Sequence, residues 1–453
     1  MESVQSQKKV FIAKCFIIVL FILASLIRIL FINNKSIFDY QYDVGVIKID
    51  SNNAYEKIYA QDREYLKPWR HLDYIMTIYN TGKLPDTNKV QQYHPPLHHL
   101  ICVGWLKLLD NFTFSAEQKL ESLQILTCIY SIVAMFIILK ICNELKLNSF
   151  YKIIVLLFVG FNPMFIIMSG FLSNDMLVSM FILLCFYLII KWRQKSSYKN
   201  TILLSLVFGL GCATKTSMLV MGMIIAAIVI TKWIISLLSR KNTSVEKPIY
   251  STKTFLLQTL IFLIIATPLS MAYPYRNYKM FNQPFIYVVK PKESLIIEER
   301  NIFKRYFPFS TEIFEDELHE DNINVFSYAI KSNIIFSLRT SIHYFTLLKF
   351  LSIILYTFAL IAMLYLFAKE SNLYVKLLII TCLIWLISFI SFNVNYPASC
   401  TMHAKYIYCY IALLPIVSTY FLQKKDSYTM SMVIYTLTTI YAVFSSLGII
   451  LLF

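Results

Sequence analysis

Two acidic residues of this chain stand where a carboxylate can do chemistry at a membrane surface. Asp43 lies in Tyr-Asp-Val-Gly shortly after the first hydrophobic run, where it is suited to act as a general base. One solvated acid in an acidic loop is the ordinary alternative, and spacing alone favours it. Asp175 lies in Ser-Asn-Asp at the junction of a short loop with an apolar run, where an unpaired carboxylate is costly. Helix N-capping by Asn174 or Asp175 explains this second position equally well.

Three isolated cations follow or precede apolar runs in the same way: Lys215, Arg276 and Lys405. They fall on the side where short loops disfavour positive charge, and each is able to hold a phosphate. The planar fork of Arg276 suits bidentate phosphate binding, whereas snorkelling is the ordinary alternative for the lysines. Together with the carboxylates, they predict an outer pocket for an anionic lipid headgroup and a neutral hydroxylated partner.

Three histidines gather around a pair of prolines in Tyr-His-Pro-Pro-Leu-His-His, residues 93–99. Prolines disrupt a helix interior but start a helix well, so a helix should begin here. Its apolar residues are interrupted by Lys107 and Asp110, too soon to cross a bilayer. We therefore expect an amphipathic helix at a membrane face, with His94, His98 and His99 near its start. Because the last two are adjacent, metal ligation is the less favoured interpretation, and interfacial polar residues are the ordinary one.

The composition indicates the class of protein that holds these residues. With 57% hydrophobic residues among 453 and a mean hydropathy of +0.60, the chain is a polytopic membrane protein rather than a soluble one. The net charge of +16 does not predict nucleic-acid binding, because Lys and Arg cluster in short segments between apolar runs. None of the nine cysteines forms a CxxC pair, so they are expected to be small core residues.

Eleven spans satisfy the positive-inside rule with a cytoplasmic N-terminus in a plasma membrane. The first run is too long for a signal-peptide core and should remain as an anchor. The expected spans are residues 10–32, 122–141, 153–168, 175–191, 201–213, 217–238, 254–272, 345–367, 377–392, 406–422 and 428–452. They leave two long outer loops, 33–121 and 273–344, within a single membrane domain of residues 1–453. All seven histidines then fall on the outer side, which favours an outward-facing polar site.

Six features in this order resemble the GT-C superfamily of polyprenyl-phosphate-sugar-dependent glycosyltransferases. They are the acidic first outer loop, His-Pro-Pro-Leu, Asn-Asp-Met-Leu, Ala-Thr-Lys, Tyr-Arg-Asn-Tyr and Ala-Lys-Tyr-Ile. The most similar branch is that of bacterial protein O-mannosyltransferases and aminoarabinose transferases. The resemblance implies an all-α membrane fold of GT-C type with an interfacial helix in the first outer loop.

The resemblance also implies roles for individual residues. Asp43 becomes the catalytic carboxylate of the first loop, and Asp175 an acid that supports the site or a divalent cation such as Mg²⁺ or Mn²⁺. The donor-binding positions it implies are His94, His98, Lys215, Arg276 and Lys405. Many relatives have paired acids where this chain has Tyr42-Asp43, and an arginine after the interfacial helix where it has only Lys119.

We therefore expect a mannosyltransferase-like enzyme that moves a hexose or pentose from a polyprenyl phosphate to an acceptor at the outer face. Direct displacement would invert the anomeric carbon, because it needs no sugar-bound enzyme intermediate. A multi-span transporter or lipid flippase is the alternative, and it should show repeat symmetry and charged or broken helices at mid-membrane. A non-catalytic scaffold or a polymerase-type ligase is a further alternative. A test of whether activity depends on the polyprenyl-phosphate donor would distinguish these alternatives from the transferase. The acceptor is expected to be a protein, a lipid or a cell-wall glycan.

Overall fold

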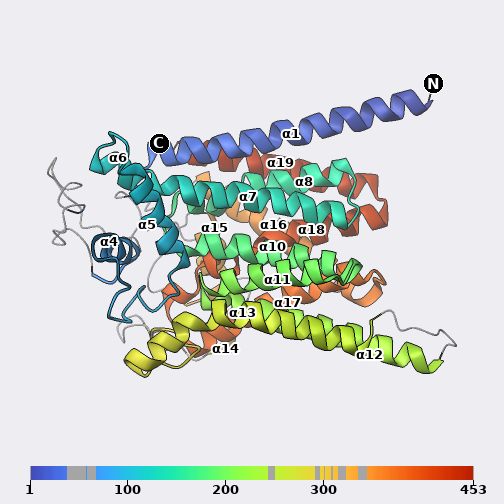
Figure 1. The fold of residues 1–453 in the computed structure, drawn as a ribbon. Coiled ribbons are helices and arrows are strands. Elements are labelled where there is room, and N and C mark those ends of the chain that lie inside the picture. The colour runs from blue at the N-terminus through green and yellow to red at the C-terminus, as the bar shows by residue number, and fades with distance from the viewer. Residues whose placement is uncertain are drawn as a thin grey trace. The chain divides into compact units, whose positions relative to one another are not determined.

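The computed structural model describes residues 2–37, 58, 68–242, 250–290, 296–299, 301–307, 310–314, 323–334 and 344–451 (Figure 1). Within these ranges all regular elements are helices, and an isolated antiparallel bridge joins Ile296 to Ala398. The chain divides into two compact units, each built from separated stretches. Unit 1 comprises Met1–Lys48, Gln118–Leu172 and Lys290–Phe453, and unit 2 comprises Ile49–Glu117 and Ser173–Val289.

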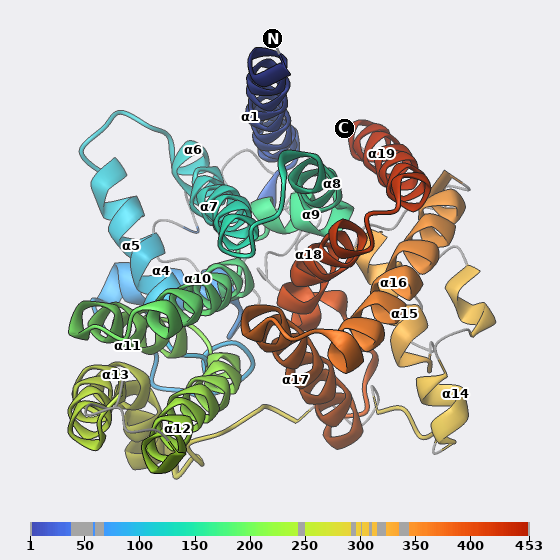
Figure 2. The ribbon, with the colours of Figure 1, turned by 90° about the vertical axis from the view of Figure 1, so that its right-hand side faces the viewer.

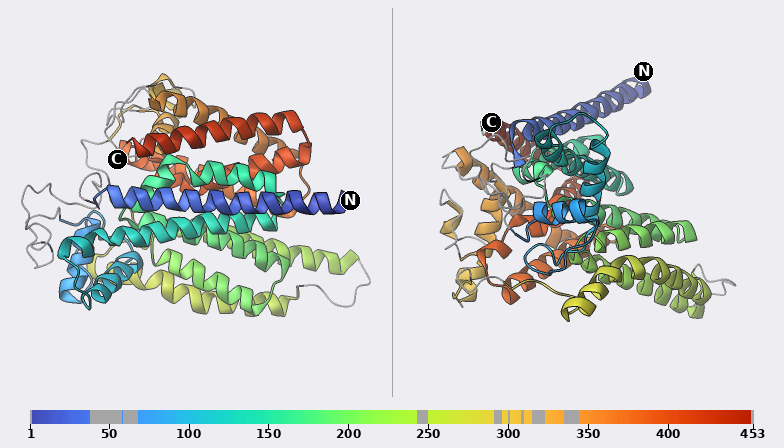
Figure 3. Two further views of the ribbon diagram at one scale, coloured as in Figure 1. Left: turned by 90° about the horizontal axis from the view of Figure 1, so that it is seen from above. Right: turned by 60° about the vertical axis from the view of Figure 1, so that its left-hand side comes forward.

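Unit 1 contains seven of the long or paired apolar helices that the sequence predicts as spans. They are α1 (Glu2–Asn34), α7 (Leu123–Glu144), the pair α8 (Ser149–Gly160) and α9 (Pro163–Gly170), α16 (Tyr344–Lys369), α17 (Leu373–Asn395), α18 (Tyr408–Lys425) and α19 (Tyr428–Ile450). Helix α1 runs beside α8, and α18 contacts α8, α16 and α17 (Figure 3). Shorter helices of this unit are α14 (Ile302–Tyr306) and α15 (Val325–Ile334), and α6 (Ala116–Glu121) crosses the boundary between the units.

Unit 2 contains α4 (His71–Thr81), α5 (Leu97–Leu109), α10 (Asn174–Gln194), α11 (Tyr198–Cys212), α12 (Leu219–Asn242) and α13 (Thr252–Phe281). Helix α11 packs against both α10 and α13 (Figure 2). Gly209 permits the close approach to α13, because a Cβ atom there would lie 2.8 Å from the Leu269 Cβ. Helix α5 begins directly after Pro96, as the double proline predicts, and it buries only one face.

The all-helical membrane fold is confirmed, with a difference in the number of spans. Nine helices of the described residues are long and apolar enough to cross a membrane, or ten if the pair α8 and α9 is one span. All eleven predicted spans have helical counterparts, but α11 has only 15 residues. The third predicted span is bent by 55° between Gly160 and Pro163, where Asn162 caps a new helix and Pro163 is its first residue.

A buried arginine satisfies the backbone at that bend. The Arg28 guanidinium of α1 donates to the carbonyl oxygens of Gly160 (2.6 Å) and Val159 (3.4 Å), which end α8. It also donates to Ser131 Oγ on α7 (2.9 Å), and its side chain is fully buried. A helix end in an apolar surrounding needs such donors, because no water reaches its last carbonyl groups.

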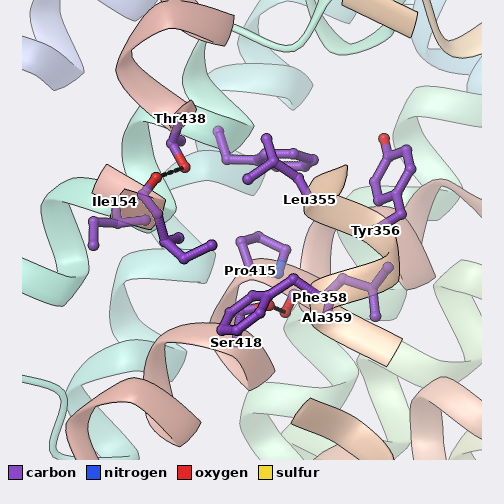
Figure 4. A pocket seen from close by; sticks show the side chains of 11 residues that line it. Ile154, Leu355, Tyr356, Phe358, Ala359, Pro415, Ser418 and Thr438 are labelled. Atoms are coloured by element: carbon purple, nitrogen blue, oxygen red, sulfur yellow. Dashed lines mark hydrogen bonds between the residues drawn. The ribbon is translucent and has the colours of Figure 1, made fainter. Parts of the chain in front are cut away.

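A small cavity lies in the membrane part of unit 1. This cavity of about 20 Å³ lies among α8, α16, α18 and α19, lined by residues such as Ile154, Leu355 and Pro415 (Figure 4). The Ser418 and Thr438 hydroxyls beside it donate to carbonyl oxygens of their own helices, Leu414 (3.1 Å) and Ile434 (2.7 Å). A space of that size holds about one water molecule, so it is a packing gap rather than a ligand site.

Candidate functional site

Five of the seven residues predicted for the site belong to unit 2, where α5 contacts both α4 and α10 (Figures 1 and 2). The start of α5 is tied to the end of α11 by a hydrogen bond from the Leu97 N–H to the Ala213 carbonyl oxygen (3.0 Å). Proline at the preceding position supplies the fixed backbone angle with which this helix starts. This long-range hydrogen bond brings the histidine-rich helix to the segment that carries Lys215.

Asp175 and Lys215 form a buried ion pair between Oδ1 and Nζ. Their residues are 5% and 9% exposed, so both charges are largely removed from water. Ser173, rather than Asn174 or Asp175, is the N-cap of α10, and its hydroxyl donates to Asp175 Oδ2 (3.2 Å). Asn174 instead donates from Nδ2 to the Thr214 carbonyl oxygen (3.2 Å), which ties the two loops together. Lys215 is therefore not the isolated cation that the sequence suggests, because it has an acidic partner.

Four histidines of unit 2 are buried and form what we call the histidine cluster: His71, His94, His98 and His99. His71 Nδ1 and His99 Nε2 share a hydrogen bond (3.0 Å), and the Tyr74 ring stacks on His99 with 4.0 Å between ring centroids. The Tyr74 hydroxyl donates to the Tyr273 hydroxyl (3.0 Å), which donates to the Gln92 carbonyl oxygen (2.6 Å). Helices α4, α5 and α13 are joined by this chain of contacts.

Burial keeps His98 and His99 uncharged at neutral pH. Burial, followed by the electrostatic repulsion between His98 and His71 that would arise if both bound a proton, lowers the pKa of His98 to about 3, although the Asp175 carboxylate acts in the opposite direction. Burial and the neighbouring His71, His98 and His94 hold the pKa of His99 well below its usual range. The His98 and His99 imidazoles therefore act as neutral hydrogen-bonding groups.

Arg276 contacts the backbone of the first loop. Its Nη2 donates to the Pro85 carbonyl oxygen (2.6 Å) and its Nη1 to Asn277 Oδ1 (3.1 Å). The guanidinium also lies 5.6 Å from the centroid of the Tyr273 ring. In the structure this arginine holds the loop that follows α4.

The other two predicted residues lie elsewhere. Lys405 belongs to unit 1, where it is half-buried just before α18, and its Nζ lies 5.8 Å from the Phe171 ring centroid. Asp43 lies outside the residues that the structure describes.

The divalent cation implied by the resemblance finds no fitting ligand set in the described part of the chain. No three His, Cys, Asp or Glu side chains of those residues are grouped in a way that could hold a metal ion. The Asp175 carboxylate is engaged by an ammonium and a hydroxyl, whereas Mg²⁺ and Mn²⁺ prefer several oxygen ligands.

The sequence did not single out His71, Tyr74 or Tyr273 as parts of this site. His71 meets His99 across 28 residues, and Tyr74 meets Tyr273 across 199. Neither separation corresponds to a spacing along one helix, so no local pattern marks these contacts.

No protein-family model matches the sequence, and no curated protein matches it either. Among solved structures, the chain is similar to the oligosaccharyltransferase AglB from Archaeoglobus fulgidus in complex with an inhibitory peptide and a dolichol-phosphate. That match has 14% identity and a TM-score of 0.51, and it covers 96% of this chain and 56% of AglB. ArnT from Cupriavidus metallidurans bound to undecaprenyl phosphate matches with 13% identity and a TM-score of 0.45, over 92% of this chain and 62% of ArnT.

The chain thus spans little more than half the length of the oligosaccharyltransferase that it matches. At this low identity the likeness concerns the fold alone. Together with the helical architecture and the apolar spans, it shows that this protein has an all-helical membrane fold similar to that of AglB.

Proposed function

We propose that this protein is a membrane glycosyltransferase that moves a sugar from a polyprenyl-phosphate carrier to an acceptor hydroxyl. The observation that supports this most is the buried Asp175–Lys215 pair, which is joined to the start of α5 through the segment 213–215 in a GT-C fold. AglB, which has the similar fold, is described in complex with a dolichol-phosphate. A transporter or flippase is not favoured, because the structural neighbours are glycosyltransferases.

The proposed sugar transfer requires a phosphate that leaves readily and an acceptor hydroxyl that loses its proton. A bond forms between the acceptor oxygen and the anomeric carbon while the bond from that carbon to the phosphate oxygen breaks, with inversion. Cations that neutralise the departing phosphate lower the barrier. Lys215 is proposed for this role, because an ammonium has three donors and can contact a phosphate oxygen as well as Asp175.

The remaining predicted residues are proposed to complete the site. Asp43 takes the acceptor's proton, Asp175 holds Lys215 in position, and His94 and His98 line the donor pocket, with His98 as a neutral group. Arg276 and Lys405 add positive charge for the lipid phosphate. The Arg276 guanidinium has five N–H donors, so it can contact the lipid phosphate while it also donates to the Pro85 carbonyl oxygen.

Donor consumption tests the function. Purified protein in lipid nanodiscs is incubated with polyprenyl-phosphate mannose and with the corresponding aminoarabinose and glucose donors, and loss of each donor is followed by mass spectrometry. We expect one donor to be consumed, and consumption to fall in Lys215→Met. Lys83→Met, at an exposed lysine of the same unit, is the control that should keep the wild-type rate. If no donor is consumed although the protein is folded and acceptors are supplied, the proposal is wrong.

Orientation is tested separately. The proposed arrangement places the N-terminus in the cytoplasm of a cell with this protein in its plasma membrane, and the site at the outer face. In a background with Cys15 and Cys400 replaced by serine, a membrane-impermeant thiol probe should label Asp86→Cys in intact cells. It should label Lys195→Cys only after permeabilisation. The reverse pattern would place the site on the inner face.

A further inference from the structure

A pocket of about 290 Å³ lies in unit 2 where the segment after α4 folds back on the start of that helix. Its polar and aromatic lining, among the described residues, is formed by Trp69, Asp73, Thr77, Asp86, Thr87 and Gln92. None of these residues has a part in the proposed transfer reaction. The pocket is therefore a separate feature of the first loop.

The polar wall of the pocket is held in one arrangement by its own hydrogen bonds. Asp73 Oδ2 accepts from the Trp69 N–H (2.8 Å) and from Gln92 Nε2 (2.9 Å). Gln92 Oε1 accepts in turn from the Thr87 hydroxyl (3.0 Å). Asp73 and Gln92 are 4% and 2% exposed, so packing fixes them as well. A polar wall that is fixed before binding saves a ligand the cost of ordering it.

The backbone around the pocket is also anchored. The Gln91 N–H donates to the Trp69 carbonyl oxygen (2.9 Å), and Arg276 holds the Pro85 carbonyl oxygen (2.6 Å). Trp69 has φ of +66°, a conformation that non-glycine residues rarely adopt. The Lys89 ammonium lies 4.6 Å from the centroid of its ring and orients the indole. The surrounding contacts thus maintain an unfavourable backbone conformation at the aromatic residue of the lining.

Charge and size select the kind of ligand. Two carboxylates line the pocket, whereas the cations Lys89 and Arg276 contact Trp69 and Pro85 without being lining residues themselves, so the lining does not favour a phosphate or an acidic sugar. Carboxylate, amide and hydroxyl groups bind hydroxyl groups, while an indole ring packs on apolar C–H faces. The volume is at the lower end of the range for small-molecule pockets, which suits a single ring rather than a lipid tail. A pyranose has hydroxyl groups on its rim and C–H groups on its faces.

We propose that this pocket is an accessory binding site for one neutral pyranose residue. The inference goes beyond the transfer reaction proposed above, because binding needs neither a donor nor turnover. If the pocket binds no pyranose, the proposed transfer reaction is not contradicted. If the protein shows no turnover, the proposed binding site is not contradicted.

Binding is tested on the full-length protein in nanodiscs, since detergents with glucoside or maltoside headgroups would compete. The probes are methyl α-mannoside, methyl β-glucoside and methyl β-galactoside, followed by saturation-transfer NMR with titration. We expect millimolar affinity for at least one of them, as is usual for a single small polar ligand. Asp86→Asn should weaken it about fivefold to tenfold through one lost charged hydrogen bond, and Trp69→Ala by about tenfold or more.

Asp110→Asn is the matched control. Asp110 is another exposed carboxylate of unit 2, it accepts from the Tyr79 hydroxyl (2.6 Å), and it does not line the pocket. Thermal unfolding of each variant verifies its folding, and the exposed Asp86 provides a test even if Trp69→Ala fails to fold. Three results would overturn the proposal: no binding of any neutral glycoside, equal binding by the folded variants, or preference for spermidine or methyl glucuronide.

Discussion

Removing one partner of the Asp175–Lys215 pair should destabilise the protein far more than removing both. Lys215→Met leaves a carboxylate in a residue that is only 5% exposed, and Asp175→Asn leaves an ammonium in a residue that is 9% exposed. Breaking a buried pair in this way typically lowers the free energy of unfolding by about 3–5 kcal/mol, because the remaining charge has no partner and is still shielded from water. The double variant Asp175→Asn/Lys215→Met contains neither charge and should recover most of the loss.

The assay is a double-mutant cycle on the free energy of unfolding, measured in micelles by SDS titration with fluorescence detection. We expect a coupling energy above about 2 kcal/mol for this pair. The Lys304–Glu299 pair is the control: its N–O distance is 3.2 Å, its side chains are 62% and 26% exposed, and its coupling should be below about 1 kcal/mol. Equal coupling energies for the two pairs would refute the argument from burial. Added Mn²⁺ should not restore the activity of Asp175→Asn, because its role here is to hold Lys215.

Three further perturbations test other parts of the structure. Arg28→Leu should lower the free energy of unfolding by about 3 kcal/mol or more, since two terminal carbonyl groups of α8 lose their donor and each costs about 1–3 kcal/mol; an unchanged unfolding midpoint would contradict the capping role. Asp43→Asn should reduce the rate of sugar transfer by about 10²–10⁴-fold with donor affinity retained, while Asp39→Asn from the same acidic loop should stay near wild type; the opposite ranking would show that the base is misassigned. Stability should also fall as the pH is lowered below about 6.5, by up to about 1.4 kcal/mol per unit down to about pH 3, because His98 binds a proton when unfolded but not when buried. His98→Asn should flatten that part of the unfolding profile, and a slope that persists unchanged would assign it to other groups.

The helices of this protein follow from local sequence. Apolar runs predict all eleven helical segments, although α11 is shorter than a membrane span, and the double proline predicts where α5 starts. Both signals are local, because a helix satisfies its backbone within its own segment whatever the rest of the chain does. The same reasoning missed the bend at Asn162 and Pro163, because the apolar residues on both sides of this pair dominate the hydropathy of the segment.

Which side chains contact one another, in contrast, is decided by the tertiary structure. Isolated charges at Asp175 and Lys215 were visible in the sequence, but only the fold shows that they form a pair across 40 residues. Arg28 is one basic residue in an apolar run until α1 packs beside α8, where it reaches the Gly160 carbonyl oxygen 132 residues away. The physical reason is that hydropathy and charge position a segment with respect to the membrane, whereas neighbours within the protein depend on how the helices pack on one another.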